Sequence, residues 1–335
     1  MKSNITMRDI AEQLDVSIVT VSKALNDKEG VSDALKEKIR QTADDMGYRY
    51  NAMAKAIKEG LSYNIGVIIP ERFTGSAQSF YLRFYQEITK VLEKKQYCGI
   101  LHILSEEDEE QGVWPRIYYE KKVDAFIILG QVGTSYMEKF KEITTPYLFL
   151  DFYSDQSDVD SIVTDNFYGM YELTNHLINY NHTDIAFVGN IYSTSSIQDR
   201  YLGYYKSLLE HRLPLRNDYI INDRDEHGAF IDFDLPADMP SAFVCNCDQV
   251  AYNLIQTLHE KGYKVPEDCS VVGFDNDIYA TLSKPGITTM DVDVEEMSRV
   301  AVKFIINKLH DPSKSYGRMF VKGNIVYRDS VMRKA

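Results

Sequence analysis

The residues best placed to do chemistry lie near the start of the chain, in the run from Val16 to Asn26. Ser17 is a good helix N-cap, because its hydroxyl can accept a hydrogen bond from a free amide of the first helical turn. The apolar residues that follow fall on one side at helical spacing: Val21, Ala24 and Leu25. The other side carries a short mixed face of Ile18, Val19, Ser22 and Lys23. A helix with these two faces has the shape needed to enter a DNA major groove.

Two further short helices are expected around this one. Thr6 can cap a helix over Met7–Leu14, with Asp9 at the capping-box position. Ser32 can cap a helix over Asp33–Met46, and Gly47 is well placed to end it in the left-handed conformation. The three helices would share one small core made of Ile10, Leu14, Val21, Leu25, Val31, Leu35, Ile39 and Met46. The pattern predicts a compact helix-turn-helix headpiece.

A fourth helical pattern covers residues 51–59, capped by Asn51 and stopped by Gly60. Isolated helices need roughly 12–15 residues to hold in water, so this one is expected to form only when something packs against it. The alternative interpretation is an interdomain linker with a frayed turn. With this segment the headpiece would span residues 1–60.

The charge of the chain is divided unevenly. The formal net charge is −13, yet residues 1–60 contain ten basic and ten acidic side chains, so the whole acidic excess lies in residues 61–335. An acidic body repels DNA, which leaves DNA binding to the neutral headpiece.

From Tyr63 onward, short apolar runs alternate with amphipathic helical patterns. The expected strands are Ile65–Pro70, Cys98–Leu104, Ala125–Leu129, Tyr147–Leu150, Ile185–Val188, Ala242–Cys245 and Ser270–Phe274. The expected helices are Tyr81–Lys95, Tyr168–Asn179, Arg200–His211, Val250–Lys261 and Glu295–His310. This alternation indicates an α/β fold with parallel sheets covered by helices. The series occurs twice, which predicts two similar lobes and a ligand cleft between them.

Several other classes of protein and site are disfavoured. No stretch approaches the ~20 apolar residues of a membrane span and no apolar signal core follows Met1, so a cytoplasmic protein is expected. Cys245 and Cys247 lie close together, but no His or second Cys pair has metal-ligand spacing near them, so we expect free buried thiols, no metal and no cofactor. Neither a nucleophile elbow nor a phosphate-binding loop is present, which disfavours an enzyme.

These residues resemble the lactose-repressor (LacI/GalR) family of bacterial transcription regulators over almost the whole chain. The headpiece run looks like the pattern of that family, with Lys23 where Arg is commoner. Further matching segments follow in order: Asp165-Asn166 with Gly169, His176-Leu177, Asn181-His182, Ile185–Gly189, Arg200 with Gly203-Tyr204, Asp248 with Ala251, Val265–Asp275, Ile287–Thr289 and Val326–Ser330. Their order and spacing together are highly specific.

The resemblance implies a homodimeric repressor or activator with a periplasmic-binding-protein-like core that reports a small effector to the headpiece. It implies an N-terminal core lobe of residues 61–162 and 292–320, and a C-terminal core lobe of residues 163–291 and 321–335. The operator is then expected to be a pseudo-palindrome in double-stranded DNA. Because the chain ends soon after Ser330 without a heptad tail, a dimer is favoured over a tetramer.

For DNA, the resemblance places Ile18, Val19 and Lys23 at base edges. It places other side chains nearer the phosphates: Thr6, Ser17, Thr20, Ser22 and Asn26. The positions of Ile18 and Val19 are commonly polar in relatives, and their apolar side chains predict contact with thymine methyl groups. The alternative is that both residues extend the headpiece core.

Residues 51–59 match the hinge helix of the family, which orders on specific DNA and enters the minor groove. The resemblance assigns Ile57 the wedge role usually held by Leu, and gives Ala54 and Lys55 contacts in the groove. Such a wedge partly unstacks a base step and kinks the duplex.

For the effector, the matching cleft positions are Phe80, Tyr81, Asp151, Arg200, Cys247 and Asp275. Carboxylates and a guanidinium suit sugar hydroxyls, and aromatic rings suit the apolar faces of a sugar. A sugar is therefore expected, with a nucleobase stacked on Phe80 and Tyr81 as the first alternative. The two Asp residues could instead cap strand ends. Residues 222–240 hold Asp and Pro where relatives usually have a helix, so we expect an altered rim on the second lobe.

A transport binding protein is the remaining alternative, opposed by the headpiece and by the lack of a signal peptide. Switching is expected through a change in lobe closure, because an effector shifts such an equilibrium only by differential affinity for its two states.

Overall fold

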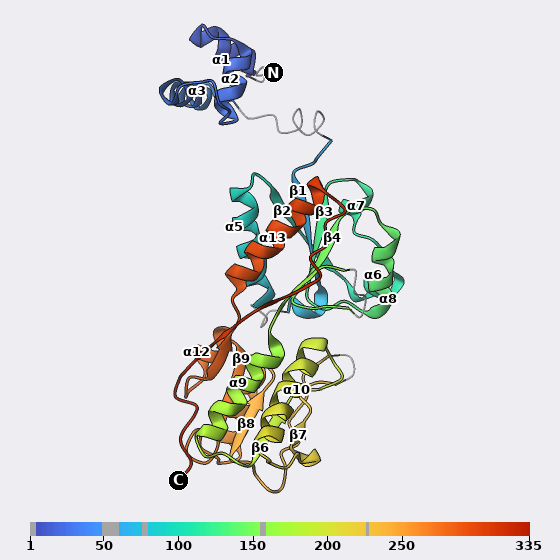
Figure 1. Cartoon of the computed structure of the whole chain (residues 1–335), viewed down its shortest axis with the longest axis vertical. Coiled ribbons are helices and arrows are strands. Elements are labelled where there is room, and N and C mark those ends of the chain that lie inside the picture. The colour runs from blue at the N-terminus through green and yellow to red at the C-terminus, as the bar shows by residue number, and fades with distance from the viewer. Residues whose placement is uncertain (1–4, 49–59, 76–79, 155–158, 226–227) are drawn as a thin grey trace. The chain divides into compact units, whose positions relative to one another are not determined.

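The computed structural model describes residues 5–48, 60–75, 80–154, 159–225 and 228–335 (Figure 1). The chain divides into two compact units, Met1–Leu61 and Ser62–Ala335. The described part of the first unit is helical, and the second unit is α/β. The predicted hinge helix over residues 51–59 lies outside the described residues.

The described part of the headpiece, residues 5–48, contains three helices whose N-cap positions are the predicted ones. They are α1 (Met7–Leu14), α2 (Ile18–Leu25) and α3 (Asp33–Asp45). The Thr6 backbone amide and hydroxyl both donate to Asp9 Oδ2, at 2.7 and 2.8 Å, which completes the predicted capping box. The Thr20 amide donates to Ser17 Oγ at 3.0 Å. Ser32 occupies the N-cap position of α3 without a side-chain bond, and Gly47 takes a φ of +69° after its end.

The small headpiece core is the predicted one. Its fully buried members come from all three helices: Ile10, Ala11, Val21, Ala24, Ile39 and Ala43. The other predicted core residues, Leu14, Leu25, Val31, Leu35 and Met46, pack around them while partly buried. This core fixes the orientation of α2, since Val21 and Ala24 face inward and set which side of the helix remains outside.

The first lobe of the core unit is a six-stranded parallel sheet in the order β11-β5-β4-β3-β1-β2. Its strands are β1 (Asn64–Pro70), β2 (Cys98–Leu104), β3 (Ala125–Leu129), β4 (Tyr147–Leu150), β5 (Ser161–Thr164) and β11 (Arg318–Val321). Helices α5 (Phe80–Lys94) and α13 (Val294–His310) lie side by side on one face (Figure 1). Helices α6 (Glu106–Gln111), α7 (Arg116–Tyr119) and α8 (Thr134–Lys139) lie on the other face, with Trp114 and Phe140 in their core.

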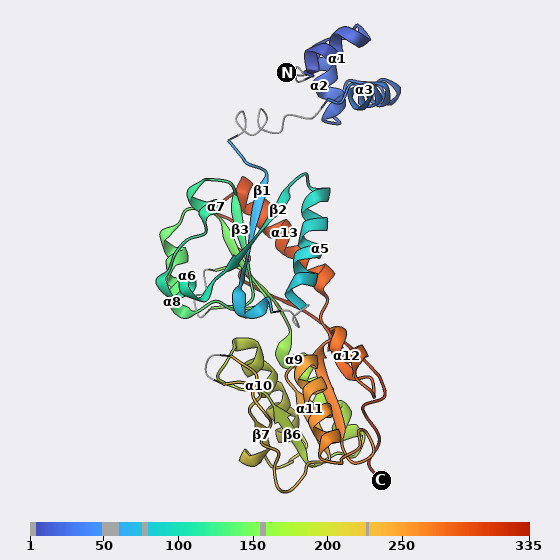
Figure 2. The same cartoon turned by 180° about the vertical axis from the view of Figure 1, so that it is seen from behind.

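The second lobe repeats this architecture with one reversed strand. Its sheet has the order β12-β10-β9-β8-β6-β7, and only the pairing of β10 with β12 is antiparallel. Its strands are β6 (Ile185–Val188), β7 (Ile220–Ile221), β8 (Ala242–Cys245), β9 (Ser270–Asp275), β10 (Thr288–Asp291) and β12 (Asn324–Val326). Helices α9 (Asn166–Asn179) and α10 (Ser195–Glu210) pack on one face. Helix α11 (Asp248–Glu260) covers the other, with α12 (Ile278–Leu282) beside it (Figure 2).

The chain passes from one sheet to the other three times, after β5, after β10 and after β11. The expected lobe boundaries after residues 162 and 320 lie inside β5 and β11, which continue to Thr164 and Val321. Because each strand stays in one sheet to its last residue, both of these crossings come slightly later than expected.

All seven predicted strands are present, and the α/β prediction is confirmed. The strands that the sequence analysis missed are short or lie at sheet edges: β5, β7, β10, β11 and β12. Helix α10 begins five residues before the predicted start at Arg200, because Thr194 caps it by accepting from the Ile197 amide at 3.2 Å. Among the described helices, none is both long enough and apolar enough to cross a bilayer.

Candidate functional sites

The outer face of α2 carries two apolar side chains in water. Ile18 is 44% exposed and Val19 is 64% exposed, and neither contributes to the headpiece core. Their neighbour Val21 is fully buried. The alternative that Ile18 and Val19 extend the core is therefore wrong, and both remain available to a partner of the headpiece.

Polar groups surround this apolar pair. Ser17 Oγ and Thr20 Oγ1 lie 2.8 Å apart in a hydrogen bond, and Lys23 is exposed in the next turn. The Asn26 side-chain amide donates to the Ser22 carbonyl at 2.7 Å, which caps the carboxyl end of α2. Thr6 is exposed at the start of α1. The predicted hinge contacts of Ala54, Lys55 and Ile57 lie outside the described residues.

In the core unit, one cavity of about 120 Å³ is lined by all six predicted effector residues: Phe80, Tyr81, Asp151, Arg200, Cys247 and Asp275. The two aromatic residues begin α5 of the first lobe, and Asp151 directly follows β4 of that lobe. Arg200 lies in α10, Asp275 ends β9, and Cys247 precedes α11, all in the second lobe. Since the carboxyl ends of parallel strands meet at one edge of a sheet, each lobe presents this edge to the shared cavity. We call this cavity the inner chamber.

Asp151 supplies an acceptor from the first lobe. Its backbone has a φ of +67°, a left-handed conformation that is uncommon for a non-glycine residue. Tyr81 Oη donates to its Oδ2 at 2.8 Å, and its buried Oδ1 makes no hydrogen bond to the described residues. Burial raises the pKa of Asp151 to about 6, against the opposing effects of Arg200 and of the Tyr81 hydrogen bond. One oxygen of this buried carboxylate accepts a hydrogen bond and the other does not, so a ligand hydroxyl or amine could donate to the second oxygen.

Arg200 and Asp275 form the corresponding pair in the second lobe. Arg200 is 5% exposed, and its Nη2 lies 3.1 Å from Asp275 Oδ1 without the alignment of a hydrogen bond. Its Nε donates to Asn166 Oδ1 at 2.8 Å, its Nη1 donates to the Asn246 carbonyl at 2.5 Å, and its Cζ lies 3.8 Å from the centre of the Phe274 ring. The guanidinium is thereby fixed in place at the chamber wall.

The titration of Asp275 reflects this setting. Burial raises its pKa to about 7, although Arg200 lowers it, and nearby Asp151 adds to the increase. Its φ of +105° is a strained conformation for a residue with a side chain. Backbone strain of this kind is often found at ligand-binding sites, and this residue lines the inner chamber.

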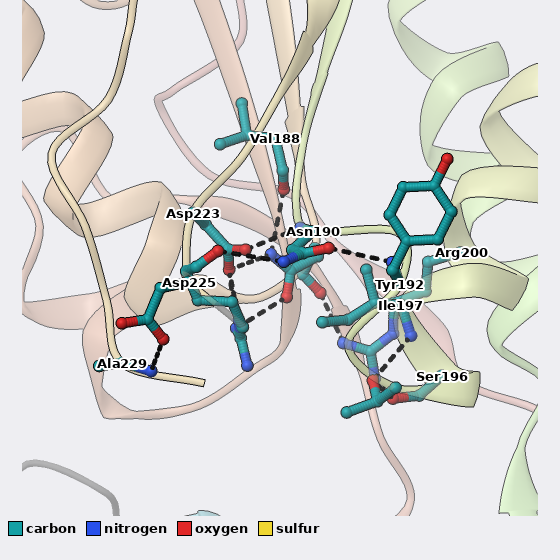
Figure 3. Close-up of polar contacts among 12 residues, drawn as sticks. Val188, Asn190, Tyr192, Ser196, Ile197, Arg200, Asp223, Asp225 and Ala229 are labelled. Atoms are coloured by element: carbon teal, nitrogen blue, oxygen red, sulfur yellow. Dashed lines mark hydrogen bonds and ion pairs between the residues drawn. The ribbon is translucent and has the colours of Figure 1, made fainter. Parts of the chain in front are cut away.

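A polar network that sequence reasoning missed supports the second-lobe wall (Figure 3). Fully buried Asp223 accepts from the Asn190 amide at 2.8 Å, from Asn246 Nδ2 at 2.8 Å and from Arg224 Nη2 at 2.7 Å. Asn246 Nδ2 also donates to the Val188 carbonyl at 3.0 Å. Asn246 and Arg224 line the inner chamber. Asn246 could have been found from the sequence, because it directly follows the apolar strand β8. Asp223 could not, because the strand before it, β7, has only two residues and leaves no recognisable apolar run.

Two polar bridges join the lobes beside the chamber. Gln131 Oε1 of the first lobe accepts from the Ser195 amide and hydroxyl of the second, at 2.9 and 3.1 Å. Tyr153 Oη lies 3.0 Å from Asp199 Oδ2, and the Arg318 guanidinium stacks on the Tyr153 ring at 3.5 Å. These bridges link the two lobes beside the inner chamber.

The rim of the second lobe contains no helix in the described part of residues 222–240. An isolated antiparallel bridge pairs Arg224 with Phe230, and the Ala229 amide donates to Asp225 Oδ1 at 2.9 Å (Figure 3). Both Arg224 and Phe230 line the inner chamber. The departure from a helical rim therefore places an arginine and an aromatic ring at the cavity.

The cysteines are free thiols with different surroundings. Cys245 and Cys269 are buried, Cys98 is exposed, and Cys247 lines the inner chamber. Burial raises the pKa of Cys247 to about 12, so it faces a ligand as a neutral thiol. Within the described ranges, no cluster of three or more His, Cys, Asp or Glu side chains has metal-binding geometry.

Each of the two units contains a segment that matches a known protein family model. Residues 6–51 match the model "Bacterial regulatory proteins, lacI family", and residues 174–331 match a "Periplasmic binding protein-like domain". The "Probable HTH-type transcriptional repressor ExuR" of Bacillus subtilis is 26% identical over 98% of this chain and 99% of its own length. The HTH-type transcriptional repressor PurR of Vibrio parahaemolyticus is also 26% identical, over 98% and 99% of the two chains.

The fold also matches solved structures. A crystal structure of the lac repressor dimer bound to operator and an anti-inducer has a TM-score of 0.74, with 22% identity over 98% of this chain and all of that chain. At this level of identity the match concerns the fold, which includes the helix-turn-helix headpiece and the two-lobed core. The chain belongs to the lacI family of bacterial DNA-binding transcription regulators.

Proposed function

We propose that this chain is a transcriptional repressor that binds a pseudo-palindromic operator as a homodimer and is controlled by a sugar in the inner chamber. The relatives described above are repressors that match nearly the full length of the chain. The chamber then serves to bind a ligand and not to convert it.

The observation that carries the sugar proposal is the opposition of Asp151 and Asp275 across the inner chamber. The two carboxylates come from different lobes, and each has a buried oxygen without a hydrogen bond to the described residues. Ligand hydroxyls can donate to both, and the Arg200 and Asn246 side chains supply further polar groups in the same wall. A polyol that bridges the lobes in this way would stabilise the closed arrangement.

The aromatic wall completes the fit to a sugar ring. Phe73 and Tyr81 are 5.1 Å apart with planes tilted by 55°, and Phe80 meets Tyr81 edge-on at 5.2 Å. The three rings present mixed edges and faces to the chamber and form no pair of parallel planes. This surface suits the apolar patches of a pyranose or furanose, whereas a flat nucleobase is held best between parallel rings.

The DNA-binding part of the proposal rests on α2. Ile18, Val19 and Lys23 would meet base edges, with Thr6, Ser17, Thr20, Ser22 and Asn26 nearer the phosphates. The exposed Ile18 and Val19 would contact thymine methyl groups. Ala54, Lys55 and Ile57 would enter the minor groove, with Ile57 as the wedge.

The effector is tested by calorimetry of the full chain against a panel of monosaccharides and a panel of nucleobases and nucleosides. We expect binding of a monosaccharide, reduced at least about tenfold in Asp151→Asn, which keeps the shape but removes the charged acceptor. Asp329→Asn, an exposed Asp of the second lobe, is the matched control and should change nothing. Binding of a nucleobase alone, or full affinity of Asp151→Asn for the sugar, would reject the sugar proposal.

The operator is tested by selection from randomised duplexes with the full chain, followed by binding measurements in the presence of the sugar identified. A pseudo-palindrome with A·T pairs under Ile18 and Val19 is expected. Ile57→Ala should weaken binding to that operator and leave nonspecific binding unchanged. Unchanged specific affinity of Ile57→Ala would remove the wedge.

A further inference from the structure

Both polar bridges between the lobes end on one helix of the second lobe, α10. Gln131 Oε1, from the loop after β3, accepts from the Ser195 amide at 2.9 Å and from the Ser195 hydroxyl at 3.1 Å. Tyr153 Oη, from the loop after β4, lies 3.1 and 3.0 Å from the two carboxylate oxygens of Asp199. Ser195 and Asp199 are four residues apart at the start of α10, so they lie on the same side of the helix. The first lobe therefore contacts one end of α10 at two points.

The first of these contacts satisfies a free amide at the start of α10. Thr194 is the N-cap, and its hydroxyl accepts from the Ile197 amide at 3.2 Å. The amide of Ser195, the first residue of α10, has no acceptor within the helix. Gln131 supplies that acceptor from the other lobe. If the lobes moved apart, the Ser195 amide would need another acceptor, so this contact favours the arrangement in which they are together.

The loop that carries Gln131 is fixed within the first lobe. Its backbone carbonyl accepts from Arg72 Nη2. Arg72 is held in turn by Glu109, which accepts from both of its terminal nitrogens at 2.6 and 3.2 Å. Glu109 Oε1 also accepts from the Gly133 amide at 2.5 Å, two residues after Gln131. Since the Glu109 side chain is buried, these bonds are shielded from water and hold the loop in position for α10.

The second contact is also supported on the first-lobe side. The Arg318 guanidinium stacks on the Tyr153 ring at 3.5 Å, and its Nη2 donates to the Ser154 carbonyl at 3.3 Å. Burial and the nearby Asp199 raise the pKa of Tyr153 to about 12, so its hydroxyl stays protonated and donates. Neither Tyr153 nor Asp199 lines the inner chamber. This contact can therefore act on an effector only through the position of the lobes.

The same end of α10 carries a residue of the inner chamber. Arg200 directly follows Asp199 and lines the chamber together with Asp151 of the first lobe. Separation of the lobes at α10 would move Arg200 away from Asp151, so the two bridges and the chamber take part in one movement. A ligand that contacts both lobes binds the arrangement in which they are together. Its apparent affinity is then its intrinsic affinity multiplied by the fraction of molecules in that arrangement.

We propose that Gln131, Tyr153, Ser195 and Asp199 form a latch that sets how often the lobes are together before any effector binds. We call these four residues the α10 latch. Tyr153 and Asp199 are positioning residues for an effector that they do not contact. The consequence for effector affinity rests on the proposed sugar effector, whereas the consequence for the lobes does not.

The arrangement of the lobes is measured in the ligand-free full chain by energy transfer between two dyes. One dye is attached to Cys98 of the first lobe and the other to a cysteine introduced by Lys261→Cys in the second, both at exposed positions. Burial raises the pKa values of the other three thiols, which therefore react slowly. The labelled chain with an intact latch should give one main distance. Tyr153→Phe combined with Gln131→Ala should add a second distance, and a saturating sugar should remove it again.

The affinity for the sugar is measured by calorimetry in the unlabelled variants. Tyr153→Phe should weaken sugar binding about three- to tenfold, although the aromatic ring and its contact with Arg318 remain. Tyr171→Phe is the matched control, because Tyr171 Oη donates to Glu210 of α10 at 2.7 Å but both residues belong to the second lobe. It should change neither the sugar affinity nor the distance between the dyes.

Two pairs of variants test whether the contacts themselves carry the effect. Tyr153→Phe should have no further effect in an Asp199→Ala background, since its partner is already gone, whereas Asp199→Asn keeps an acceptor and should retain most of the affinity. Ser195→Pro removes both donors to Gln131. Proline suits the first position of a helix after the extended backbone of Thr194, at φ −140° and ψ 156°. Gln131→Ala should then have no further effect.

The outcomes separate the α10 latch from the proposed function. An unchanged distance distribution in the Tyr153→Phe, Gln131→Ala double variant would reject the latch, even if sugar binding is weaker. A full effect of Tyr153→Phe in the Asp199→Ala background would reject it as well. If no sugar binds, the proposed effector fails, while a second distance in the ligand-free double variant still supports the latch.

Discussion

The outer face of α2 and the inner chamber are built in opposite ways. The α2 face is formed by consecutive residues of one short helix, with Ile18 and Val19 exposed and unsupported by other elements. The inner chamber takes its residues from many segments between Phe73 and Asp277, and its wall includes the ion pair of Arg200 with Asp275. A substitution of Ile18 or Val19 should therefore change recognition with little change in stability, whereas a substitution in the chamber should change both.

The largest loss of stability is expected for a substitution of Arg200, a residue that both lines the inner chamber and supports the fold around it. Arg200→Ala leaves Asp275 without its cation and removes the donors to Asn166 and to the Asn246 carbonyl. Loss of one partner from a buried ion pair costs about 3–5 kcal/mol of unfolding free energy. Urea unfolding followed by tyrosine fluorescence measures this loss. Arg299→Ala, which removes an exposed arginine of α13, serves as the control and should lose less than about 1 kcal/mol.

The next prediction is that the unfolding free energy depends on pH through the carboxylates of the inner chamber and not through the α2 face. The folded-state pKa values of Asp151 and Asp275 are raised to about 6 and about 7, above the ordinary value of about 3.9 in an unfolded chain. Between about pH 4 and pH 7 the folded state then binds more protons, so these two groups lower the unfolding free energy as pH rises through this window. The two pKa values lie about 1 and about 2 units above pH 5, so the stability of the Asp151→Asn, Asp275→Asn double variant relative to the native chain should rise by on the order of 4 kcal/mol from pH 5 to pH 8.

The unfolding free energies of the native chain and of the double variant are measured in urea at both pH values. Subtracting one from the other removes the contribution of the titrating groups that the two chains share. Equal pH dependence in the native chain and the double variant would mean that the two carboxylates titrate normally. The α2 face contains no acidic residue, so Val19→Ala should leave the pH profile unchanged.

A smaller effect compares two neighbouring valines of α2. Val19→Ala should weaken binding to the selected operator about tenfold, equivalent to about 1.4 kcal/mol, and change the unfolding free energy by less than about 0.5 kcal/mol. Val21→Ala removes the same atoms from the buried side of the helix and should destabilise the headpiece instead. Anisotropy with labelled operator and thermal unfolding by circular dichroism distinguish the two results. Equal effects of both variants on stability would show that the two faces are not independent.

The smallest effect concerns the start of α2. Ser17→Ala removes the acceptor for the Thr20 amide, which should cost about 1 kcal/mol of headpiece stability. Ser17→Asp keeps an acceptor at the N-cap and should retain stability. If Ser17→Asp keeps stability but loses operator affinity, position 17 needs an uncharged hydroxyl for DNA binding, which agrees with its proposed place near a phosphate.

The headpiece was predicted closely because its signals are local. Thr6, Ser17 and Gly47 lie within one helical turn of the groups that they cap, so their types alone mark where the helices begin and end. The central strands of both lobes were predicted for a similar reason, since burial on both faces gives continuous apolar runs. Edge strands such as β7 and β12 carry no such run and were missed.

Six residues of the inner chamber were named by resemblance to a family, position by position, and the structure places these six around one cavity. The supporting residues were not named. Asp223, Asn190 and Asn246 meet only because β6, β7 and β8 are neighbours in the sheet, a pairing that no spacing in the chain indicates.

The sequence by itself determined the helix-turn-helix headpiece, the alternating α/β core and the neutral headpiece on an acidic body, because caps, periodicity and charge act over a few residues. Only the tertiary structure decided that Asp151 and Asp275 line one chamber from different lobes, and that Arg224 and Phe230 line both this chamber and a second cavity. Those contacts join segments tens of residues apart, and burial is the main cause of the raised pKa values of the two carboxylates. The chemistry of the cavity therefore depends on packing that the linear order of residues does not express.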